Sequence, residues 1–374
     1  MPSSTPELYI GLMSGTSMDG IDAALVDFSG AQPELIATHN HHWPDEIQQA
    51  LLAARDIPDE QLSSLASLDL QAAEIFADAC FELLKNTSYQ AQDIIAIGNH
   101  GQTIRHRPDI DNPFSLQIGN AQKLAAITGI DVISDFRTAD IKACGQGAPL
   151  APAFHQAVFQ NNNNNRVIVN IGGISNITIL PKDSGRSETV TGFDCGPGNT
   201  LMDAWISQHR QQSYDADGAL SASGTTNAQL LARLLMDEYF QLAPPKSTGF
   251  EYFNLEWLGR YIEDEMSCAD VQSTLCDLTA ISIIRAINQY AQNTDEIYIC
   301  GGGVHNKELM RRLKTLTKCS VLTTEALGVH PDWVEAMAFA WLAYRNIHQQ
   351  TGNLPSVTGA KKAVVLGKVT NHPV

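Results

Sequence analysis

Three glycine-rich turns are the clearest places for chemistry in this chain, and each follows a short apolar run typical of a β-strand. They are SGTSMDG at Ser14–Gly20, FDCGPGNT at Phe193–Thr200 and CGGGVHN at Cys300–Asn306. Small residues let the main chain approach a phosphate closely, and hydroxyl groups add hydrogen-bond donors. The turns therefore predict a site for a phosphorylated ligand. For the first and third turns, an ordinary hairpin and a plain turn are the alternatives.

The second turn adds a charged group to this pattern. Asp194 ends an expected strand, and glycines lead from it into an expected helix that begins near residue 199. A carboxylate beside a helix N-terminus suits phosphoryl transfer, because the helix end favours negative charge on the ligand. With an ordinary pKa, the Asp194 carboxyl group is ionised at neutral pH. The alternative is a simple strand-to-helix turn in which Asn199 caps the helix.

Polar residues at two other places are candidates for binding a small molecule. In NHGQTIRHR (99–107), His100, Gln102 and Thr103 suit sugar hydroxyls or an amide, and the histidines lack any recognised metal-ligand spacing. A solvated loop is the alternative for this cluster. Glu335 either has a functional role or forms a capping box with Asp332, since D-x-x-E is typical of a helix start.

Composition excludes several classes of protein. The chain has 24 Lys and Arg against 41 Asp and Glu, a net charge of −17, which argues against a nucleic-acid partner. A phosphate must then be bound by backbone N–H groups, a cation and a few basic residues such as Arg105 and Arg107. The sequence contains no P-loop, dinucleotide-binding, protein-kinase or α/β-hydrolase motif. Seven widely spaced cysteines indicate reduced thiols and no metal site. With no secretory signal and no apolar run of about 20 residues, we expect a cytoplasmic protein without a membrane partner.

The two halves of the chain share one order of expected elements. Each begins with three short strands joined by tight turns, near residues 8–40 and 166–193, followed by helices that alternate with single strands. The strand at 94–99 ends in the polar cluster. This order predicts a duplicated α/β fold with a ligand cleft between two lobes, and a hinge near 143–150. We expect residues 1–145 to form the first lobe, with the 350–374 tail packed back on it, and residues 146–349 to form the second.

Eight motifs give the chain a family resemblance. In order they are GLMSGTSMDGID, NHGQTIRHRP, DFR, GQGAPLAPAFH, VNIGGISNIT, GFDCGPGNTLMD, CGGGVHN and VTGA. From about residue 8 to 367 the sequence resembles the 1,6-anhydro-N-acetylmuramic acid kinases. The resemblance implies the duplicated, ribonuclease H-like, two-lobed fold of the actin, hexokinase and heat-shock ATPase superfamily. It also implies a homodimer that uses ATP, Mg²⁺ and water to convert the anhydro sugar into N-acetylmuramic acid 6-phosphate during cell-wall recycling.

The resemblance also implies roles for individual residues. Asp194 matches the catalytic base, and Glu335 joins His100, Gln102 and Thr103 at the sugar. Residues matching the nucleotide site are Gly15, Thr16, Ser17, Met18, Asp19, Gly20, Ile21, Asp22, Gly196, Gly198, Asn199, Gly301, Gly302 and Gly303. Asp19 or Asp22 either holds Mg²⁺ through water or stabilises the hairpin. Two other functions stay open, namely an ordinary sugar kinase and a nucleotide-switched binding module.

Overall fold

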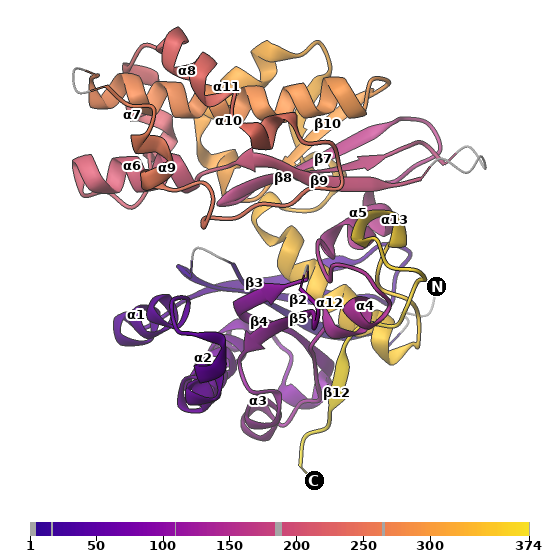
Figure 1. Ribbon diagram of the computed structural model, residues 1–374. Coiled ribbons are helices and arrows are strands. Elements are labelled where there is room, and N and C mark those ends of the chain that lie inside the picture. Colours follow the sequence, from indigo (N-terminus) through magenta and orange to yellow (C-terminus); the bar gives the residue numbers. More distant parts are fainter. Residues whose placement is uncertain (1–4, 16–17, 109, 184–188, 264–265, 374) are drawn as a thin grey trace. The chain divides into compact units, whose positions relative to one another are not determined.

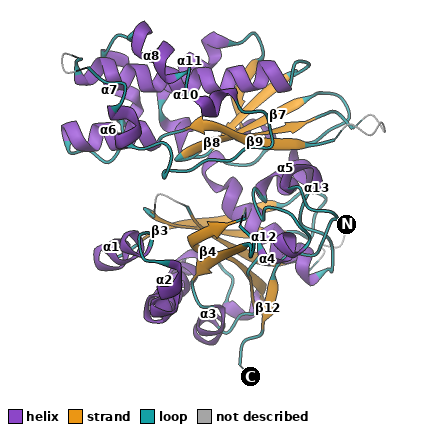
Figure 2. Cartoon of the chain, viewed as in Figure 1, coloured by secondary structure: helices purple, strands orange, loops and turns teal. Residues whose placement is uncertain are grey.

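The computed structural model describes residues 5–15, 18–108, 110–183, 189–263 and 266–373. The chain forms two compact units, one of Met1–Phe154 with Trp333–Val374 and one of His155–Asp332. Figure 1 colours the chain by residue number, so the segments of each unit can be followed along it. Each unit contains one mixed β-sheet with helices beside it (Figure 2). None of the helices in the described ranges is long and apolar enough to cross a membrane.

The first unit contains a seven-stranded sheet in the order β12-β6-β4-β1-β2-β3, with β5 paired to β4. Its strands are β1 Leu8–Ser14, β2 Gly20–Asp27, β3 Glu34–His42, β4 Ile94–Arg107, β5 Phe114–Ile118, β6 Val132–Ser134 and β12 Lys368–Thr370. Its helices are α1 Asp45–Ala54, α2 Ala66–Lys85, α3 Ala121–Thr128, α4 Thr138–Lys142, α12 Val334–Ile347 and α13 Pro355–Thr358. Helix α5, Ala151–Phe159, runs from this unit into the next.

The second unit contains a five-stranded sheet in the order β11-β10-β7-β8-β9. Its strands are β7 Arg166–Ile171, β8 Ile174–Leu180, β9 Thr191–Pro197, β10 Glu296–Cys300 and β11 Ser320–Thr323. Its helices are α6 Thr200–Arg210, α7 Ala219–Ser223, α8 Ala228–Leu234, α9 Leu255–Gly259, α10 Cys268–Tyr290 and α11 Lys307–Leu316. The apolar core lies where β7, β8 and β9 pack against α10 and α6.

Both sheets repeat one topology. In each, the first strand of the unit pairs antiparallel with the second and the second with the third, while the first also lies parallel to a later strand. Thus β7, β8, β9, β10 and β11 occupy the places of β1, β2, β3, β4 and β6. The predicted duplication is confirmed by strand order and direction, and it makes the β7–β8 turn the counterpart of the β1–β2 turn.

The division into units differs from the predicted lobe boundaries at residues 146–154 and at α12, both of which belong to the first unit. We expected residues 146–349 in the second lobe, but α12 belongs to the first unit, because it packs directly on β1 and β4. Gly11 and Gly98 make this possible: a Cβ at Gly11 would collide with the Ala336 carbonyl, and one at Gly98 with the Phe339 carbonyl. Glycines in the middle of strands were the available signal for this close approach.

Strand β4 is much longer than the strand expected at 94–99. It continues to Arg107 because residues from Gln102 onward pair with β5. The polar cluster therefore lies on a strand, and the alternative of a solvated loop is wrong.

Candidate active site

Asp194 lies on β9, the edge strand of the second unit's sheet. Its side chain is half-buried, and Oδ2 accepts a hydrogen bond of 3.0 Å from the backbone N–H of Thr248. The main chain of Asp194 is also bound: its N–H donates to the Lys246 carbonyl at 3.2 Å, and its carbonyl accepts from the Tyr239 hydroxyl at 2.8 Å. The carboxylate is therefore held in one orientation by a segment distant in sequence.

The pKa of Asp194 departs from the ordinary value that we expected. Burial raises it to about 7, the Thr248 N–H lowers it, Glu251 raises it, and Lys246 lowers it. A carboxyl group with a pKa near neutrality binds a proton more strongly than an ordinary aspartate, yet is still substantially ionised at pH 7. These are the properties of a general base.

Glycine turns crowd together at the same edge of this sheet, beyond the ends of β7, β9 and β10. A Cβ at Gly198 would collide with the Gly172 carbonyl, and a Cβ at Gly303 with the side chain of Ile171. Gly301 has φ +80° and lies against the Asn170 side chain, so a larger residue would be both strained and obstructed. The predicted turns at 196–199 and 301–303 are thus brought together, with the β7–β8 turn between them.

The N-terminus of α6 is less open than the sequence suggested. The N–H groups of Gly198, Asn199 and Thr200 donate to the carbonyls of Gly172 and Gly173 at 2.8–3.1 Å. Asn199 occupies the N-cap position, but its side chain makes no capping bond. The β7–β8 turn is the counterpart of the β1–β2 turn in strand order, and for that reason it is a candidate for phosphate contact that the sequence reasoning missed. The VNIGGISNIT motif covers this turn, and the repeated strand order is the signal that could have assigned it.

The β1–β2 turn of the first unit is braced from inside. Ser14 Oγ is 2.7 Å from Gln102 Oε1 and 2.8 Å from the Gly20 carbonyl, while Gln102 Nε2 donates to the Gly15 carbonyl at 3.1 Å. Gln102 is 0% exposed. In this structure its amide therefore positions the turn and does not face solvent.

The other predicted residues of this turn fall into two groups, those with side chains in the apolar core and those with side chains at least partly exposed. Met18 and Ile21 are core side chains, so only their main chain is available to a ligand. Asp19 is exposed, and Asp22, half-buried, accepts a hydrogen bond of 2.7 Å from Asn40 Nδ2. The predicted contacts of Thr16 and Ser17 lie outside the described residues.

His100 forms a buried polar cluster with Arg137, the arginine of the DFR motif, to which the sequence alone gave no role. His100 Nδ1 donates to the Gly101 carbonyl at 2.8 Å, so Nε2 is unprotonated and accepts from Arg137 Nη2 at 2.8 Å. Arg137 Nη1 donates to the Gly147 carbonyl at 2.9 Å. Burial first, and then the Arg137 charge, lowers the pKa of His100 to about 3. His100 is thus a neutral acceptor that orients an arginine.

Glu335 and Thr103 belong to the same unit as this cluster. Burial lowers the pKa of Arg137 to about 10, and the negative charge of Glu335 raises it, so these two groups are near each other. The half-buried Thr103 hydroxyl accepts from Gln117 Nε2 at 3.2 Å. The capping-box alternative for Glu335 is wrong, because the N-cap of α12 is Trp333 and has no side-chain capping bond.

Known proteins are similar to this chain over nearly its whole length. The sequence model of the family described as AnmK, anhydro-N-acetylmuramic acid kinase, matches residues 7–372. The chain belongs to this kinase family. A family member from Shewanella frigidimarina is 51% identical over 367 residues, which cover 97% of this chain and 98% of that relative. One from Coxiella burnetii is 47% identical over 365 residues, covering 97% of each. The activator of 2-hydroxyisocaproyl-CoA dehydratase from Clostridium difficile, a solved structure, has 11% identity and a TM-score of 0.47, covering 91% of this chain and 96% of that one.

Arg105 has a structural position in this member of the anhydro-N-acetylmuramic acid kinases. It was expected to supply local positive charge for a ligand, but its side chain is 6% exposed. Its Nε donates to Asp59 at 2.8 Å, and its Nη atoms donate to the carbonyls of Arg55, Ile57 and Ile104. Arg105 therefore stabilises the packing of β4 against the segment after α1. The expectation that it supplies positive charge for a ligand is wrong.

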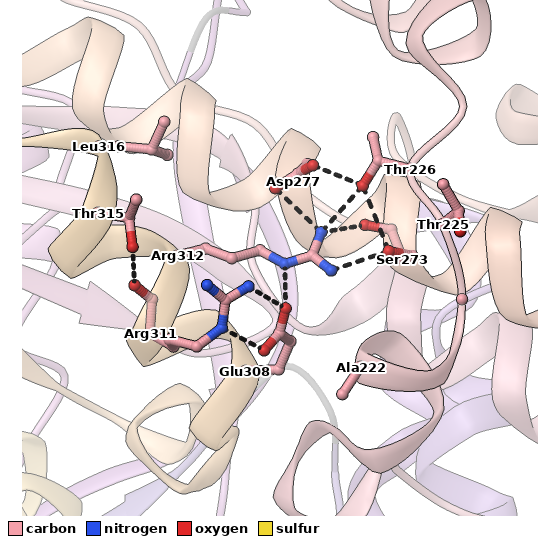
Figure 3. Close-up of a pocket in the computed structure, with 11 residues that line it drawn as sticks. Ala222, Thr225, Thr226, Ser273, Asp277, Glu308, Arg311, Arg312, Thr315 and Leu316 are labelled. Atoms are coloured by element: carbon pink, nitrogen blue, oxygen red, sulfur yellow. Dashed lines mark hydrogen bonds and ion pairs between the residues drawn. The ribbon is translucent and has the colours of Figure 1, made fainter.

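A pocket of about 420 Å³ lies beside α10 and α11 in the second unit (Figure 3). Its centre is occupied by the buried Arg312, which donates to Glu308 at 2.8 Å, pairs with Asp277 at 2.9 Å and donates to the Ser273 carbonyl at 2.6 Å. The charged groups of this pocket neutralise one another. We therefore assign the cluster the structural task of holding α11, which begins just after the Gly301–Gly303 turn, against α10.

Proposed function

We propose that the protein converts 1,6-anhydro-N-acetylmuramic acid, ATP and water into N-acetylmuramic acid 6-phosphate and ADP, in the recycling of cell-wall sugars. The single observation that carries this proposal is Asp194. It is a fixed carboxylate whose pKa is about 7, on the strand that leads into converging glycine turns, in a chain of the anhydro-N-acetylmuramic acid kinase family.

In the proposed reaction, Asp194 takes a proton from water as the water oxygen attacks the anomeric carbon C1. The bond between C1 and O6 breaks, and O6 keeps its electron pair. O6 then bonds to the γ-phosphorus of ATP, the bond between that phosphorus and the bridging oxygen breaks, and ADP leaves. Transfer of this kind depends mainly on positioning and charge neutralisation, which is consistent with a site formed largely of main-chain turns.

We assign the nucleotide to the glycine turns of the second unit, through the backbone at Gly172–Gly173 and Gly301–Gly303. In the first unit, Gly15–Asp22 keeps its own assignment as a phosphate-binding turn. On the sugar, we assign Thr103 and Glu335 direct contacts, with His100 and Arg137 orienting the carboxylate of Glu335. Gln102 acts through the Gly15 turn that it braces.

We infer that Mg²⁺ arrives with the nucleotide. Among the described residues, no group of three or more His, Cys, Asp or Glu side chains is arranged to hold a metal. Asp19 and Asp22 offer carboxylate oxygens at the β1–β2 turn, which suit Mg²⁺ through its water ligands. When bound, Mg²⁺ would neutralise charge on the phosphates.

Labelled water tests the proposal. The protein is incubated with ATP, Mg²⁺ and the anhydro sugar in H₂¹⁸O, and the product is analysed by mass spectrometry immediately after quenching. We expect a 6-phosphate with one ¹⁸O at C1, above the label acquired by authentic N-acetylmuramic acid 6-phosphate in the same water. A phosphorylated sugar without excess label would indicate an ordinary sugar kinase. ATP hydrolysis without a sugar phosphate would indicate a nucleotide-switched module.

The implied homodimer and the cytoplasmic location are also proposals. Native mass spectrometry of the purified chain tests the first, with a mass near twice 40.7 kDa expected. Cell fractionation tests the second, with the protein expected in the fraction that contains no membranes.

A further inference from the structure

The segment Asp237–Thr248 covers the open edge of β9 at Asp194. An edge strand leaves main-chain groups without partners in the sheet. Here Tyr239 binds the Asp194 carbonyl, Lys246 accepts from its N–H, and the Thr248 N–H binds its carboxylate. One segment thus contacts the carbonyl, the amide and the side chain of the same residue.

Lys246 holds this segment in shape. Its ammonium donates to the Tyr239 carbonyl at 3.1 Å and lies 4.6 Å from the centroid of the Tyr239 ring. The bond spans seven residues of sequence and joins the two parts of the segment that contact Asp194. Without it, the carbonyl of Tyr239 loses a charged donor and the Thr248 amide is less well fixed.

Asp237 anchors the other side of the segment. Its Oδ1 accepts from the Tyr239 N–H at 2.9 Å and the Tyr252 hydroxyl at 2.7 Å. Its Oδ2 accepts from Trp257 Nε1 at 2.9 Å and the Tyr261 hydroxyl at 3.2 Å. These bonds fix the start of the segment, and the Lys246 ammonium ties the later part, which carries Lys246 and Thr248, to Tyr239 at that start.

We propose that Lys246 is a positioning residue for Asp194. Its bond to Tyr239 holds the two parts of the segment together, so that the Thr248 amide keeps its hydrogen bond to the Asp194 carboxylate. This inference rests on the proposed role of Asp194 as the base. The lysine charge acts in the same direction as the amide bond, because a nearby cation favours the ionised carboxylate.

Four titratable groups face the Asp194 carboxyl: Lys246, Glu251, Cys195 and Tyr239. Burial raises the pKa of the Cys195 thiol and of the Tyr239 phenol, so both stay neutral through the range in which Asp194 titrates. Glu251 opposes ionisation of Asp194, and Lys246 favours it. Removing Lys246 should therefore move the titration of Asp194 to higher pH.

The experiment measures kcat against pH for the full chain and three variants. In Lys246→Met, we expect the acidic limb of the kcat–pH profile to move to higher pH by about 0.5–1 unit. We also expect the plateau value of kcat to fall several-fold. Lys246→Arg keeps the charge and should leave the limb near its original position. Tyr239→Phe removes the bond to the Asp194 carbonyl without changing charge, so kcat should fall without movement of the limb.

Two results would overturn the inference. One is a Lys246→Met variant whose kcat profile keeps its acidic limb at the original pH. Lys246 would then be a purely structural residue. The other is a raised KM for ATP with an unmoved limb, which would make Lys246 a phosphate ligand. If Lys246→Met does not fold, as judged by circular dichroism, Lys246→Gln serves the same comparison. Full turnover by Asp194→Asn would instead contradict the proposed base, and this outcome does not depend on Lys246.

Discussion

Asp194 in the second unit and His100 in the first both lose water on folding, but their pKa values move in opposite directions. Burial penalises the charged form, so it raises the pKa of an acid and lowers that of a base. Asp194 moves up to about 7, and His100 moves down to about 3. The same physical effect therefore brings one group to neutrality and takes the other away from it.

The neighbours of each group strengthen this contrast. The Thr248 N–H and Lys246 keep Asp194 from rising further, so it still exchanges a proton near pH 7. Arg137 pushes the pKa of His100 further down, which leaves the ring neutral and its Nε2 a permanent acceptor. We infer that the region around Asp194 performs proton transfer and that the region around His100 performs recognition.

The largest expected effect comes from removing the proposed base. Asp194→Asn should lower kcat by about 10²–10⁴-fold, the usual contribution of general acid–base catalysis. An asparagine oxygen still accepts from the Thr248 N–H, so the fold and ATP binding should be retained. Coupled measurement of ADP release with the anhydro sugar tests the first expectation, and calorimetric titration with ATP tests the second. A variant with near-normal kcat would show that another group takes the proton.

A smaller effect is expected from the recognition region. Arg137→Met removes the donor to His100 and the charge near Glu335, so kcat/KM for the sugar should fall about 10–100-fold, as expected for charge-assisted hydrogen bonds. Arg137→Lys, the matched control, keeps the charge and should lose less. Because His100 stays buried and neutral, the acidic limb of the pH profile should remain near pH 7 in both variants. If the acidic limb of the pH profile shifted in the Arg137 variants, Arg137 would affect proton transfer as well, and the two regions would not have separate roles.

The pH dependence of stability gives a third test. Folding raises the pKa of Asp194, so between about pH 4 and 7 the folded state holds a proton that the unfolded state has released. Stability contributed by this group is therefore present at low pH and lost as pH rises through about 7. Asp194→Asn should raise Tm at pH 8 by about 2–4 °C, which corresponds to on the order of 1 kcal/mol. The gain should disappear toward pH 4, and thermal melts at both pH values test this; an equal gain at both would contradict it.

Much of the fold was predictable because short stretches of sequence determine where its strands and turns lie. Apolar alternation and turn residues indicated the strands, and their order in the two halves indicated the duplication. The position of α12 was missed because its boundary depends on packing: Gly11 and Gly98 admit the helix, and nothing local to residues 334–347 records this.

The candidate site was predictable only in part, for a similar reason. Asp194 and the glycine turns are adjacent to strand ends, where spacing is informative. Lys246, Thr248 and Tyr239 reach Asp194 from about 45 to 54 residues away along the chain, in a stretch without recognisable motifs. The altered pKa of Asp194 was likewise invisible, because desolvation depends on the folded surroundings.

The smallest expected effect concerns Asp332, a carboxylate that belongs to neither region. It pairs with His305 at 2.9 Å, and the two side chains are 31% and 64% exposed, so the pair should contribute about 0–1 kcal/mol. Asp332 also makes no capping bond to α12. Asp332→Ala should therefore change the free energy of unfolding by about 0.5 kcal/mol or less and leave kcat unchanged, measured by urea denaturation and the coupled assay. A loss of more than about 1 kcal/mol in the free energy of unfolding would indicate that Asp332 does cap α12. Glu335 would then have a structural role as its capping-box partner. The recognition region would then lose one of its two charged groups, and the contrast with Asp194 would rest on His100 and Arg137 alone.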